Sequence, residues 1–497
     1  MINNIPPVSI EFASLNFGTI VPMLIAIVGA LVILCIDLAN KKLDKSLYIM
    51  LTVLFLLIDL GTLIGYSGDV RGFFDLMLVD GIAILSQAVI VIASLLFVIT
   101  AMSKLRFQEY RYPEYFALYL FMVAGFQFMV SSDSLIVIFV GLETASMALY
   151  TLIAMHNRNN AIEAAIKYFT MGALATAFFA FGSMIFYALT GTVELGLMSE
   201  ILVASDFENY PIVLLGVIFM LGALGFKLSL VPYHTWVPDV YEGATAALAG
   251  FLSIVPKMAG FVVALRFFEI FVSSGDIYVE VILYATVVLT MTIPNIIALV
   301  QTDINRMLAY SSISNAGFAM SAILIGTTQA TNALFLYWIL FLITNLGGFT
   351  MLWLNRNKDY NTFNSDHALE KYSGLIKTSP FVATMMGLFL LSLAGLPPFA
   401  LFWGKMYLIG SAVNAGYMLL ALIMVINAAI AGYYYLKPIV YMFLKDPIEG
   451  NNTKYMTNAT TPIKTLIGFC AIVTIFSILL IEPLLEIISY YVQISGY

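Results

Sequence analysis

Long apolar stretches follow one another along almost the whole chain, and they limit what it can fold into. A helix needs about 20 consecutive apolar residues to cross the hydrocarbon core of a bilayer. Of the 497 residues, 61% are hydrophobic and only 10% are charged, whereas soluble domains are about 25% charged. So few charges cannot cover the surface of water-soluble domains. The chain is therefore predicted to be an all-α, polytopic membrane protein.

Apolar stretches bounded by turn residues and charges predict about 14 transmembrane helices in one membrane domain, 1–497. The predicted helices lie near 18–38, 46–66, 80–102, 113–130, 134–153, 162–190, 211–239, 245–272, 277–300, 305–325, 329–354, 380–414, 416–443 and 462–490. An even number of crossings places both termini on the same side of the membrane.

Lysine and arginine residues are distributed unevenly over the predicted loops. Cytoplasmic loops carry an excess of these residues. Only Arg71 belongs to a loop after an even-numbered helix. The cations in or beside loops after odd-numbered helices are Lys41, Lys42, Lys45, Lys104, Arg106, Arg111, Arg158, Arg306, Arg356, Lys358, Lys371, Lys377, Lys437, Lys445, Lys454 and Lys464. This asymmetry supports the helix count and predicts that both termini lie outside.

Two predicted helices, the seventh and the twelfth, are too long for one straight crossing and contain proline. Pro232 interrupts the seventh helix, and Pro397 with Pro398 interrupts the twelfth. Proline removes a backbone hydrogen bond, which is tolerated at membrane depth only where protein or water covers the freed groups. Breaks five helices apart predict two five-helix repeats, the second inverted. The predicted segments are helices 1–3 (1–110), the first repeat (111–272), the second repeat (273–445) and helix 14 (446–497).

Four ionisable residues are predicted near the middle of the membrane: Glu143, Lys227, Lys257 and Lys405. A charged group there costs about 2.5 to 3.5 kcal/mol on insertion scales, so these side chains must face protein or water. Simpler interpretations exist. If its helix ends at residue 231, Lys227 extends to the membrane surface, and Glu143 or Lys257 could belong to a fixed structural ion pair.

Two further observations favour ordinary structural roles. Arg266 lies near the outer end of its helix and is expected to extend to the membrane surface. Glu163 and Lys167 are four residues apart, the spacing of a helix-surface ion pair.

One acid and several lysines at mid-depth are suited to moving protons. Burial lowers the pKa of a lysine and raises that of a carboxylic acid, which brings both toward neutrality. At an assumed separation of about 7 Å and an effective dielectric constant of about 20, Glu143 and Lys227 would interact by roughly 2.4 kcal/mol. Moving the partner away could therefore switch the protonation of Lys227. His234, after the break at Pro232, is a candidate relay or an interfacial histidine.

The start of the tenth helix is unusually polar. It contains Asp303, Arg306, Tyr310, Ser311, Ser312, Ser314 and Asn315. Small hydroxyl residues commonly pack membrane helices together, so packing is the expected role and a water path is the alternative.

Cysteine and histidine are too scarce for most cofactor sites. Cys35 and Cys470 cannot form a disulfide framework or a four-cysteine iron–sulfur site. With three histidines and no GxGxxG or Walker A pattern, no metal, dinucleotide or ATP site is predicted. Redox chemistry would have to take place in other chains.

The segments HTWVPDVYEGA (234–244), RMLAYSSISNAG (306–317) and LPPFALFWGK (396–405) carry a family resemblance. The chain resembles the antiporter-like membrane subunits of proton-pumping NADH:quinone oxidoreductase, respiratory complex I, and among them the subunit N family. PDVYEGA is the most specific element. The resemblance covers most of the chain and is strongest from about 130 to 410.

The resemblance implies site residues, partners and a location. The family's key acid and lysines match Glu143, Lys227, Lys257 and Lys405, but Asn315 stands where the family often has a histidine. The resemblance implies a fourteen-helix fold with discontinuous helices 7 and 12. FMN, iron–sulfur clusters and quinone are expected in partner subunits. Other membrane subunits, M and a small K-like subunit, are the expected partners, without nucleic acid, in a bacterial inner membrane with periplasmic termini.

Three other functions stay open from the sequence. A subunit of a multi-subunit sodium/proton antiporter would have a similar fold and similar lysines, although PDVYEGA disfavours it. A purely structural membrane subunit would hold its charges in static ion pairs. A solute carrier lacks any sequence feature that recommends a substrate.

Overall fold

The protein is described by a computed structural model, which covers residues 15–40, 44–65, 68–103, 109–354, 367–447 and 459–496. The α-helices are α2 (Val21–Ala39), α3 (Lys45–Thr62), α4 (Gly81–Val98), α5 (Pro113–Val130), α6 (Leu135–Ala154), α7 (Asn159–Thr190), α8 (Leu195–Ala204), α9 (Tyr210–Leu228), α10 (Val237–Gly243), α11 (Ala246–Leu252), α12 (Val255–Val272), α13 (Ile277–Leu299), α14 (Ile304–Ile325), α15 (Thr328–Leu354), α16 (Leu375–Thr378), α17 (Pro380–Ala394), α18 (Ala400–Asn414), α19 (Met418–Leu444), α20 (Thr461–Ile475) and α21 (Ile481–Ile494).

Short 3₁₀ helices and one hairpin complete the described elements. The 3₁₀ helices are η1 (Phe17–Ile20), η2 (Leu63–Gly65), η3 (Ile99–Met102), η4 (Glu109–Arg111), η5 (Leu369–Tyr372) and η6 (Ser477–Leu480). The strands β1 (Val70–Gly72) and β2 (Met77–Val79) pair antiparallel, with Val70 opposite Val79.

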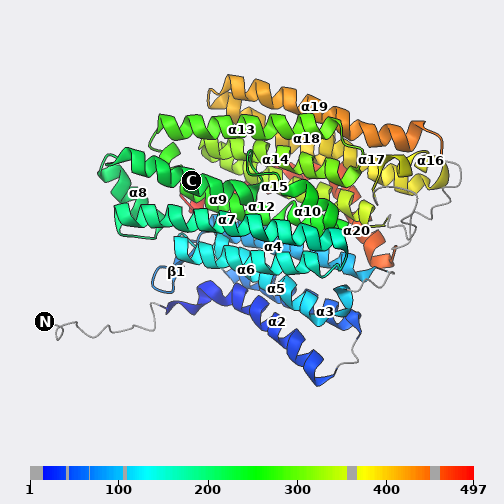
Figure 1. Cartoon of the computed structure of the whole chain (residues 1–497), viewed down its shortest axis with the longest axis horizontal. Coiled ribbons are helices and arrows are strands. Elements are labelled where there is room, and N and C mark those ends of the chain that lie inside the picture. Colours follow the sequence, from blue (N-terminus) through cyan, green and yellow to red (C-terminus); the bar gives the residue numbers. More distant parts are fainter. Residues whose placement is uncertain are drawn as a thin grey trace.

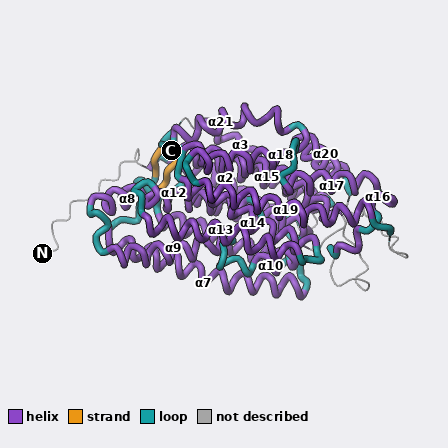
Figure 2. The backbone as a smooth tube through the Cα atoms, turned by 90° about the horizontal axis from the view of Figure 1, so that it is seen from above, coloured by secondary structure: helices purple, strands orange, loops and turns teal. Residues whose placement is uncertain are grey.

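Helices run side by side through the whole molecule (Figures 1 and 2). Within the described ranges, 13 helical segments are long and apolar enough to cross a membrane. The broken pair α17 and α18 adds one further crossing, which gives the predicted fourteen. The all-helical membrane fold is therefore confirmed.

The seventh and twelfth crossings are broken where proline predicted it. α9 ends at Leu228 and α10 begins at Val237, while α17 ends at Ala394 and α18 begins at Ala400. Both first halves end on a left-handed residue, Ser229 (φ 63°) or Gly395 (φ 81°). The prediction of discontinuous helices 7 and 12 is confirmed, whereas the residue boundaries of the two repeats stay a prediction.

Two further crossings contain interruptions that the sequence did not predict. The eighth is divided into α11 and α12 at residues 253–254, just before Pro256. The fourteenth is divided into α20, η6 and α21 near residue 476. Helix α8 and the hairpin were also not predicted, because each is too short to produce a clear apolar period.

Both described ends of the chain pack against the segment around the hairpin. The Phe73 N–H donates to the Leu15 carbonyl (3.0 Å), and the Ile82 N–H donates to Ser495 Oγ (2.7 Å). Figure 2 accordingly shows the C-terminal end beside the strands. The two ends lie on the same side of the bundle, as an even number of crossings requires.

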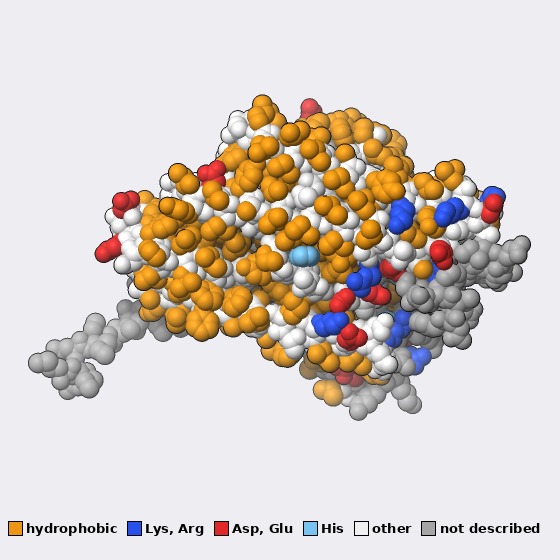
Figure 3. All heavy atoms as spheres, turned by 45° about the horizontal axis from the view of Figure 1, so that its top comes forward, with side chains coloured by type: hydrophobic (Ala, Val, Ile, Leu, Met, Phe, Trp, Pro, Cys, Tyr) orange, Lys and Arg blue, Asp and Glu red, His pale blue; other side chains and the backbone are white. Residues whose placement is uncertain are grey.

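Charged side chains are concentrated away from a broad apolar belt. On the face shown in Figure 3, lysine and arginine gather at one end of the molecule and hydrophobic side chains cover the middle. Seven of the predicted inner cations lie outside the described residues: Lys41, Lys42, Lys104, Arg106, Arg356, Lys358 and Lys454.

Arg71, the single cation predicted in the outer loops, joins the hairpin to two other loops. It donates to Asp133 at 2.8 Å and to Glu194 at 2.9 Å. Burial raises the pKa of the Glu194 carboxyl, and the neighbouring Asp133 adds to this, although Arg71 opposes the shift. The ion pairs therefore attach β1 to the ends of helices α5 and α8.

Candidate functional site

Three lysines predicted at mid-depth are buried, and each lies close to an interruption of its helix. Lys227 is in the last turn of α9, Lys257 is in the first turn of α12, and Lys405 is in α18, six residues after Phe399. Their exposed fractions are 7%, 1% and 4%. None of them extends to the membrane surface, so the snorkelling interpretation of Lys227 is wrong.

Lys227 is bound by a hydroxyl and surrounded by aromatic rings. Its Nζ donates to Ser146 Oγ of α6 at 2.5 Å, and Ser146 Oγ in turn donates to the Leu142 carbonyl. The rings of Tyr150 and Tyr168 lie 5.9 Å from Nζ. The last turn of a helix favours a positive charge, because unpaired carbonyls face it.

Glu143 lies one turn before Ser146 on α6 and is half-buried. Its carboxylate accepts a hydrogen bond from Thr176 Oγ1 of α7. Within the described part of the chain, Glu143 and Lys227 do not form an ion pair. The carboxylate attracts the ammonium only from a greater distance, so the pairing of these residues stays a prediction.

Lys257 is held by a single residue of α14. Its Nζ donates to the Ser312 carbonyl at 2.6 Å and to Ser312 Oγ at 2.7 Å. Ser312 Oγ also contacts the Tyr241 hydroxyl of α10 at 3.3 Å. Because Lys257 lies in the first turn of α12, the helix dipole opposes a positive charge on it.

Lys405 binds the end of the other half of its own broken helix. Its Nζ donates to the Leu393 carbonyl of α17 at 3.2 Å, and the Phe318 ring centroid lies 5.4 Å away. A Cβ on Gly395 would lie 3.1 Å from Lys405 Cδ. The absence of a side chain at position 395 therefore makes room for the lysine.

Buried hydroxyl and amide groups lie between the Lys257 and Lys405 regions. Ser311 Oγ is hydrogen-bonded to the Tyr435 hydroxyl of α19, and the Tyr337 hydroxyl contacts the Asn315 carbonyl at 3.5 Å. Ser311, Ser312, Ser314 and Asn315 of helix 10 are thus buried between helices, whereas Arg306 and Tyr310 at its start are only partly buried. The tyrosines were not predicted as site residues, although a buried tyrosine in an apolar helix needs a partner for its hydroxyl.

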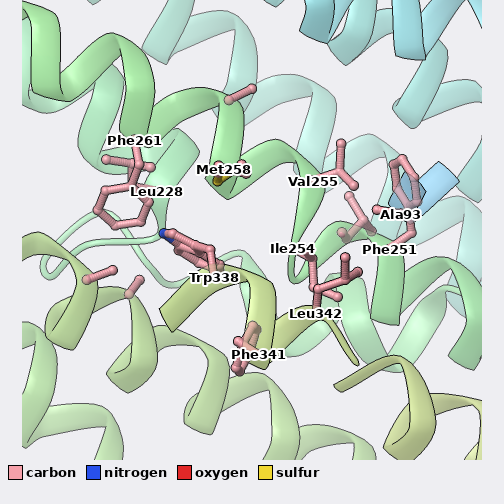
Figure 4. Packing of buried hydrophobic residues seen from close by; sticks show 14 of the residues in the cluster. Ala93, Leu228, Phe251, Ile254, Val255, Met258, Phe261, Trp338, Phe341 and Leu342 are labelled. Carbon is pink, nitrogen blue, oxygen red and sulfur yellow. The ribbon is translucent and has the colours of Figure 1, made fainter. Parts of the chain in front are cut away.

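Apolar side chains fill much of the space between the end of α9 and α12. Figure 4 shows Leu228 and Phe261 beside Trp338, and a Cβ on Gly260 would lie 2.9 Å from Leu228 Cδ2. Any polar connection from Lys227 to Lys257 must therefore pass around this apolar contact.

Four buried polar atoms near the lysines have no protein hydrogen-bond partner in the described ranges. They are Ser229 Oγ, His234 Nδ1, Asn315 Nδ2 and Trp338 Nε1. Buried groups of this kind are usually satisfied by internal water. His234 is half-buried in the connection between α9 and α10, and its role as a relay stays a prediction.

A cluster of charged residues lines an open cleft at one end of the bundle. Lys167 contacts Glu163 at 2.7 Å and Asp239 at 2.8 Å, so the predicted Glu163–Lys167 pair is confirmed. Arg306 joins the cluster through Asp239 at 3.2 Å and Glu242 at 2.5 Å. The PDVYEGA segment thus contributes its two acids to a surface ion-pair network.

Arg266 differs from its predicted role. It is 6% exposed and donates to Asp80 at 2.8 Å and to the Val130 carbonyl at 3.2 Å. The prediction that it extends to the membrane surface is wrong, because an acid at the start of α4 gives it a buried partner.

Comparisons with known proteins agree on one family. Residues 132–431 match the family described as NADH:quinone oxidoreductase/Mrp antiporter, TM. NADH-quinone oxidoreductase subunit N of Sulfurimonas denitrificans is 60% identical over 99% of each chain. The subunit N of a Sulfurovum species is 54% identical, again over 99% of each chain.

Solved structures are similar over nearly the whole length. A chain of respiratory complex I from Thermus thermophilus is 27% identical with a TM-score of 0.78, and the match covers 94% of this chain and 98% of that one. A chain of the Mrp complex from a Dietzia species is 20% identical with a TM-score of 0.81, and the match covers 96% of this chain and 97% of that one. The second likeness shows the fold alone.

Proposed function

Because the chain belongs to the N subunits of NADH-quinone oxidoreductase, antiporter-like membrane subunits of respiratory complex I, we propose that its buried lysines carry protons across the membrane. Lys227, with Glu143 as its electrostatic partner, receives a proton from the inner side. Lys257 passes the proton on. Lys405 releases it outward or hands it to a neighbouring subunit.

One observation supports this proposal most strongly. In the described part of the chain, no carboxylate lies within 4 Å of any of the three lysine ammonium groups. Removing an unpaired charge from water costs several kcal/mol. Static structural lysines would be expected to have acidic partners, as Arg266 has in Asp80. Lysines bound only by neutral oxygens can lose a proton without leaving an acid uncompensated.

Hydroxyl groups and internal water supply the connections between the lysines. Ser146, Ser312 and Tyr241 are hydrogen-bonded at or next to Lys227 and Lys257. The unpartnered Ser229, Asn315 and Trp338 atoms favour water in the same region. His234, whose Nδ1 is also unpartnered, acts as a further relay at the break of helix 7.

Electron transfer is proposed to occur in other subunits of the complex. The chain acts as part of a proton-translocating oxidoreductase without a redox centre of its own, and FMN, iron–sulfur clusters and quinone belong to its partners. Its neighbours are an M-type subunit and a small K-like subunit. The cation-rich end faces the cytoplasm of a bacterial cell, so both termini lie on the periplasmic side of the inner membrane.

Substitution of Lys227 tests whether this residue takes up and releases protons. Lys227→Met cannot hold a proton, whereas Lys227→Arg keeps a permanent charge, because guanidinium does not deprotonate in proteins. Both should lower proton flux through this subunit by about a hundredfold, since a positioned acid–base group contributes about 10² to 10⁴-fold. Glu143→Gln should lower it less. Proton translocation and quinone reduction are measured together in membrane vesicles that contain the whole complex.

Lys377→Met is the matched control, because Lys377 is a surface lysine paired with Asp446. It should leave pumping unchanged. A static structural role for Lys227 predicts that Lys227→Arg pumps normally, and normal pumping in both Lys227 variants would refute the proposed role.

A further inference from the structure

Asp59 is a buried acid outside the matched family region. It lies in α3 and is 0% exposed, and both of its carboxyl oxygens are 2.9 Å from Gln127 Nε2 of α5. No ion pair with Asp59 occurs among the residues that the structure describes. An ionised carboxylate here would therefore be buried against one neutral donor group, which is unfavourable.

Gln127 provides the complementary observation. Its side chain is 0% exposed, and its Oε1 is buried without a hydrogen-bond partner in the described ranges. A protonated carboxyl group offers one donor and one acceptor, and a primary amide offers the same pair in reverse. If Asp59 carries a proton, its hydroxyl can donate to Oε1 while Nε2 donates to the other carboxyl oxygen. One proton then satisfies both buried groups.

The helices packed on α3 place no compensating charge near Asp59. On α2, Asp37 accepts from Tyr48 in the first turn of α3, at the opposite end from Asp59. Helix α4 carries no titratable residue, and Asp80 at its start is bound by Arg266.

The remaining acid on these packed helices is also distant. Glu114 lies in the first turn of α5, 13 residues before Gln127, which is about 20 Å along the helix.

We infer that Asp59 and Gln127 form a proton-binding site, separate from the lysines, in which Asp59 is a neutral carboxylic acid in the resting protein. The bound ligand is a single proton. Asp59 is six residues before Gly65, the end of η2, or about 9 Å from that end of the crossing. Uptake of the proton adds a second hydrogen bond between helices α3 and α5, and its loss leaves only the bond from Gln127 Nε2, with Gln127 Oε1 unsatisfied.

Infrared difference spectroscopy of the complete complex in lipid tests the protonation directly. Subtracting the Asp59→Asn spectrum from the wild-type spectrum at neutral pH should leave the carbonyl stretch of one protonated carboxylic acid. Gln127→Leu should shift this stretch to higher frequency, because the hydrogen bond is lost. A carboxylate stretch in place of the carboxylic acid stretch would overturn the inference.

Hydrogen exchange in α3 provides a second measurement. After the intrinsic pH dependence of amide exchange is divided out, raising the pH should lower the protection of the wild-type helix, whereas Asp59→Asn keeps an uncharged pair with Gln127 and its protection should not change. Asp44→Asn, on the exposed cap of the same helix, is the matched control and should leave both the carboxylic acid stretch and the pH response intact. A pH response that persists unchanged in Asp59→Asn would contradict the site. These outcomes do not depend on whether the lysines pump.

Discussion

The two broken helices each have a backbone carbonyl near the break that accepts a hydrogen bond from a side chain, but the donor residues differ. At the break of helix 7, Trp236 Nε1 donates to the Phe226 carbonyl at 3.0 Å, while Lys227 binds a different helix through Ser146. At the break of helix 12, Lys405 itself donates to the Leu393 carbonyl at 3.2 Å. The Phe226 carbonyl thus accepts from a neutral indole and from the Ser229 N–H (3.1 Å), whereas the Leu393 carbonyl accepts from the titratable lysine.

The difference separates two roles of these lysines: binding a proton, and holding the end of a broken helix. Lys227 can lose its proton or change partner while Trp236 still holds the end of α9. Loss of the charge weakens the hydrogen bond from Lys405 to the Leu393 carbonyl, because a neutral amine is a weaker donor than an ammonium, so protonation at helix 12 is coupled to the geometry of the break. We therefore expect the second break, and not the first, to respond to the charge of its lysine.

Methionine in place of each lysine gives the largest expected contrast. Lys405→Met leaves the Leu393 carbonyl without its charged donor, which costs about 2 kcal/mol, or roughly thirtyfold faster local exchange. Lys227→Met should leave exchange at the end of α9 unchanged. Hydrogen-exchange mass spectrometry of the intact complex over residues 391–399 and 225–231 makes the comparison. Equal effects at both breaks would remove the distinction.

The left-handed residues that end the first halves give the next contrast. Gly395→Ala places a Cβ in a left-handed conformation and 3.1 Å from Lys405 Cδ, so it should destabilise the break by about 1.5 kcal/mol. Ser229→Gly removes the steric strain of a left-handed serine, but glycine also gains conformational freedom in the unfolded chain. The two effects oppose each other, so stability should change by only a few tenths of a kcal/mol. The same exchange measurement applies, and a larger effect at position 229 would reverse the expected order.

Trp236→Phe should have a smaller effect than Lys405→Met or Gly395→Ala. The ring keeps its place against Tyr168, whose ring is stacked at 4.3 Å, but the hydrogen bond to Phe226 is lost. A neutral hydrogen bond contributes about 1 kcal/mol, so exchange at the end of α9 should rise about fivefold. Lys227 should continue to support pumping in the vesicle assay. If exchange does not change, other contacts hold this helix end.

The crossings could be predicted because apolar length and proline act locally. Interior proline marked the breaks of helices 7 and 12 before any tertiary contact was known. The interruption before Lys257 depends on how α11 and α12 pack, and the signal available was only Pro256 itself. Near the interruption at residue 476, the nearest helix-breaking residue in the sequence is Pro483. The hairpin depends on ion pairs from Arg71 to two acids that are distant in the sequence.

The candidate site could be predicted only as a set of unusual residues. An ionisable group is costly in lipid wherever it lies, so Lys257 and Lys405 were recognisable from their positions alone. Their partners, Ser312 and the Leu393 carbonyl, depend on contacts between helices far apart in the chain. Asp59 was overlooked, although an acid inside LFLLIDLGT is itself a signal.

The bond from Ile82 to Ser495 spans 413 residues, and this separation has a consequence for biosynthesis. The third crossing leaves the ribosome early. The acceptor of its Ile82 N–H, Ser495 Oγ, is synthesised only when translation is almost finished. Until then, helix α4 must remain in the lipid with a surface that α21 will later cover. Chains that stop before residue 495 should consequently be held with insertion chaperones or degraded by membrane proteases instead of joining the complex.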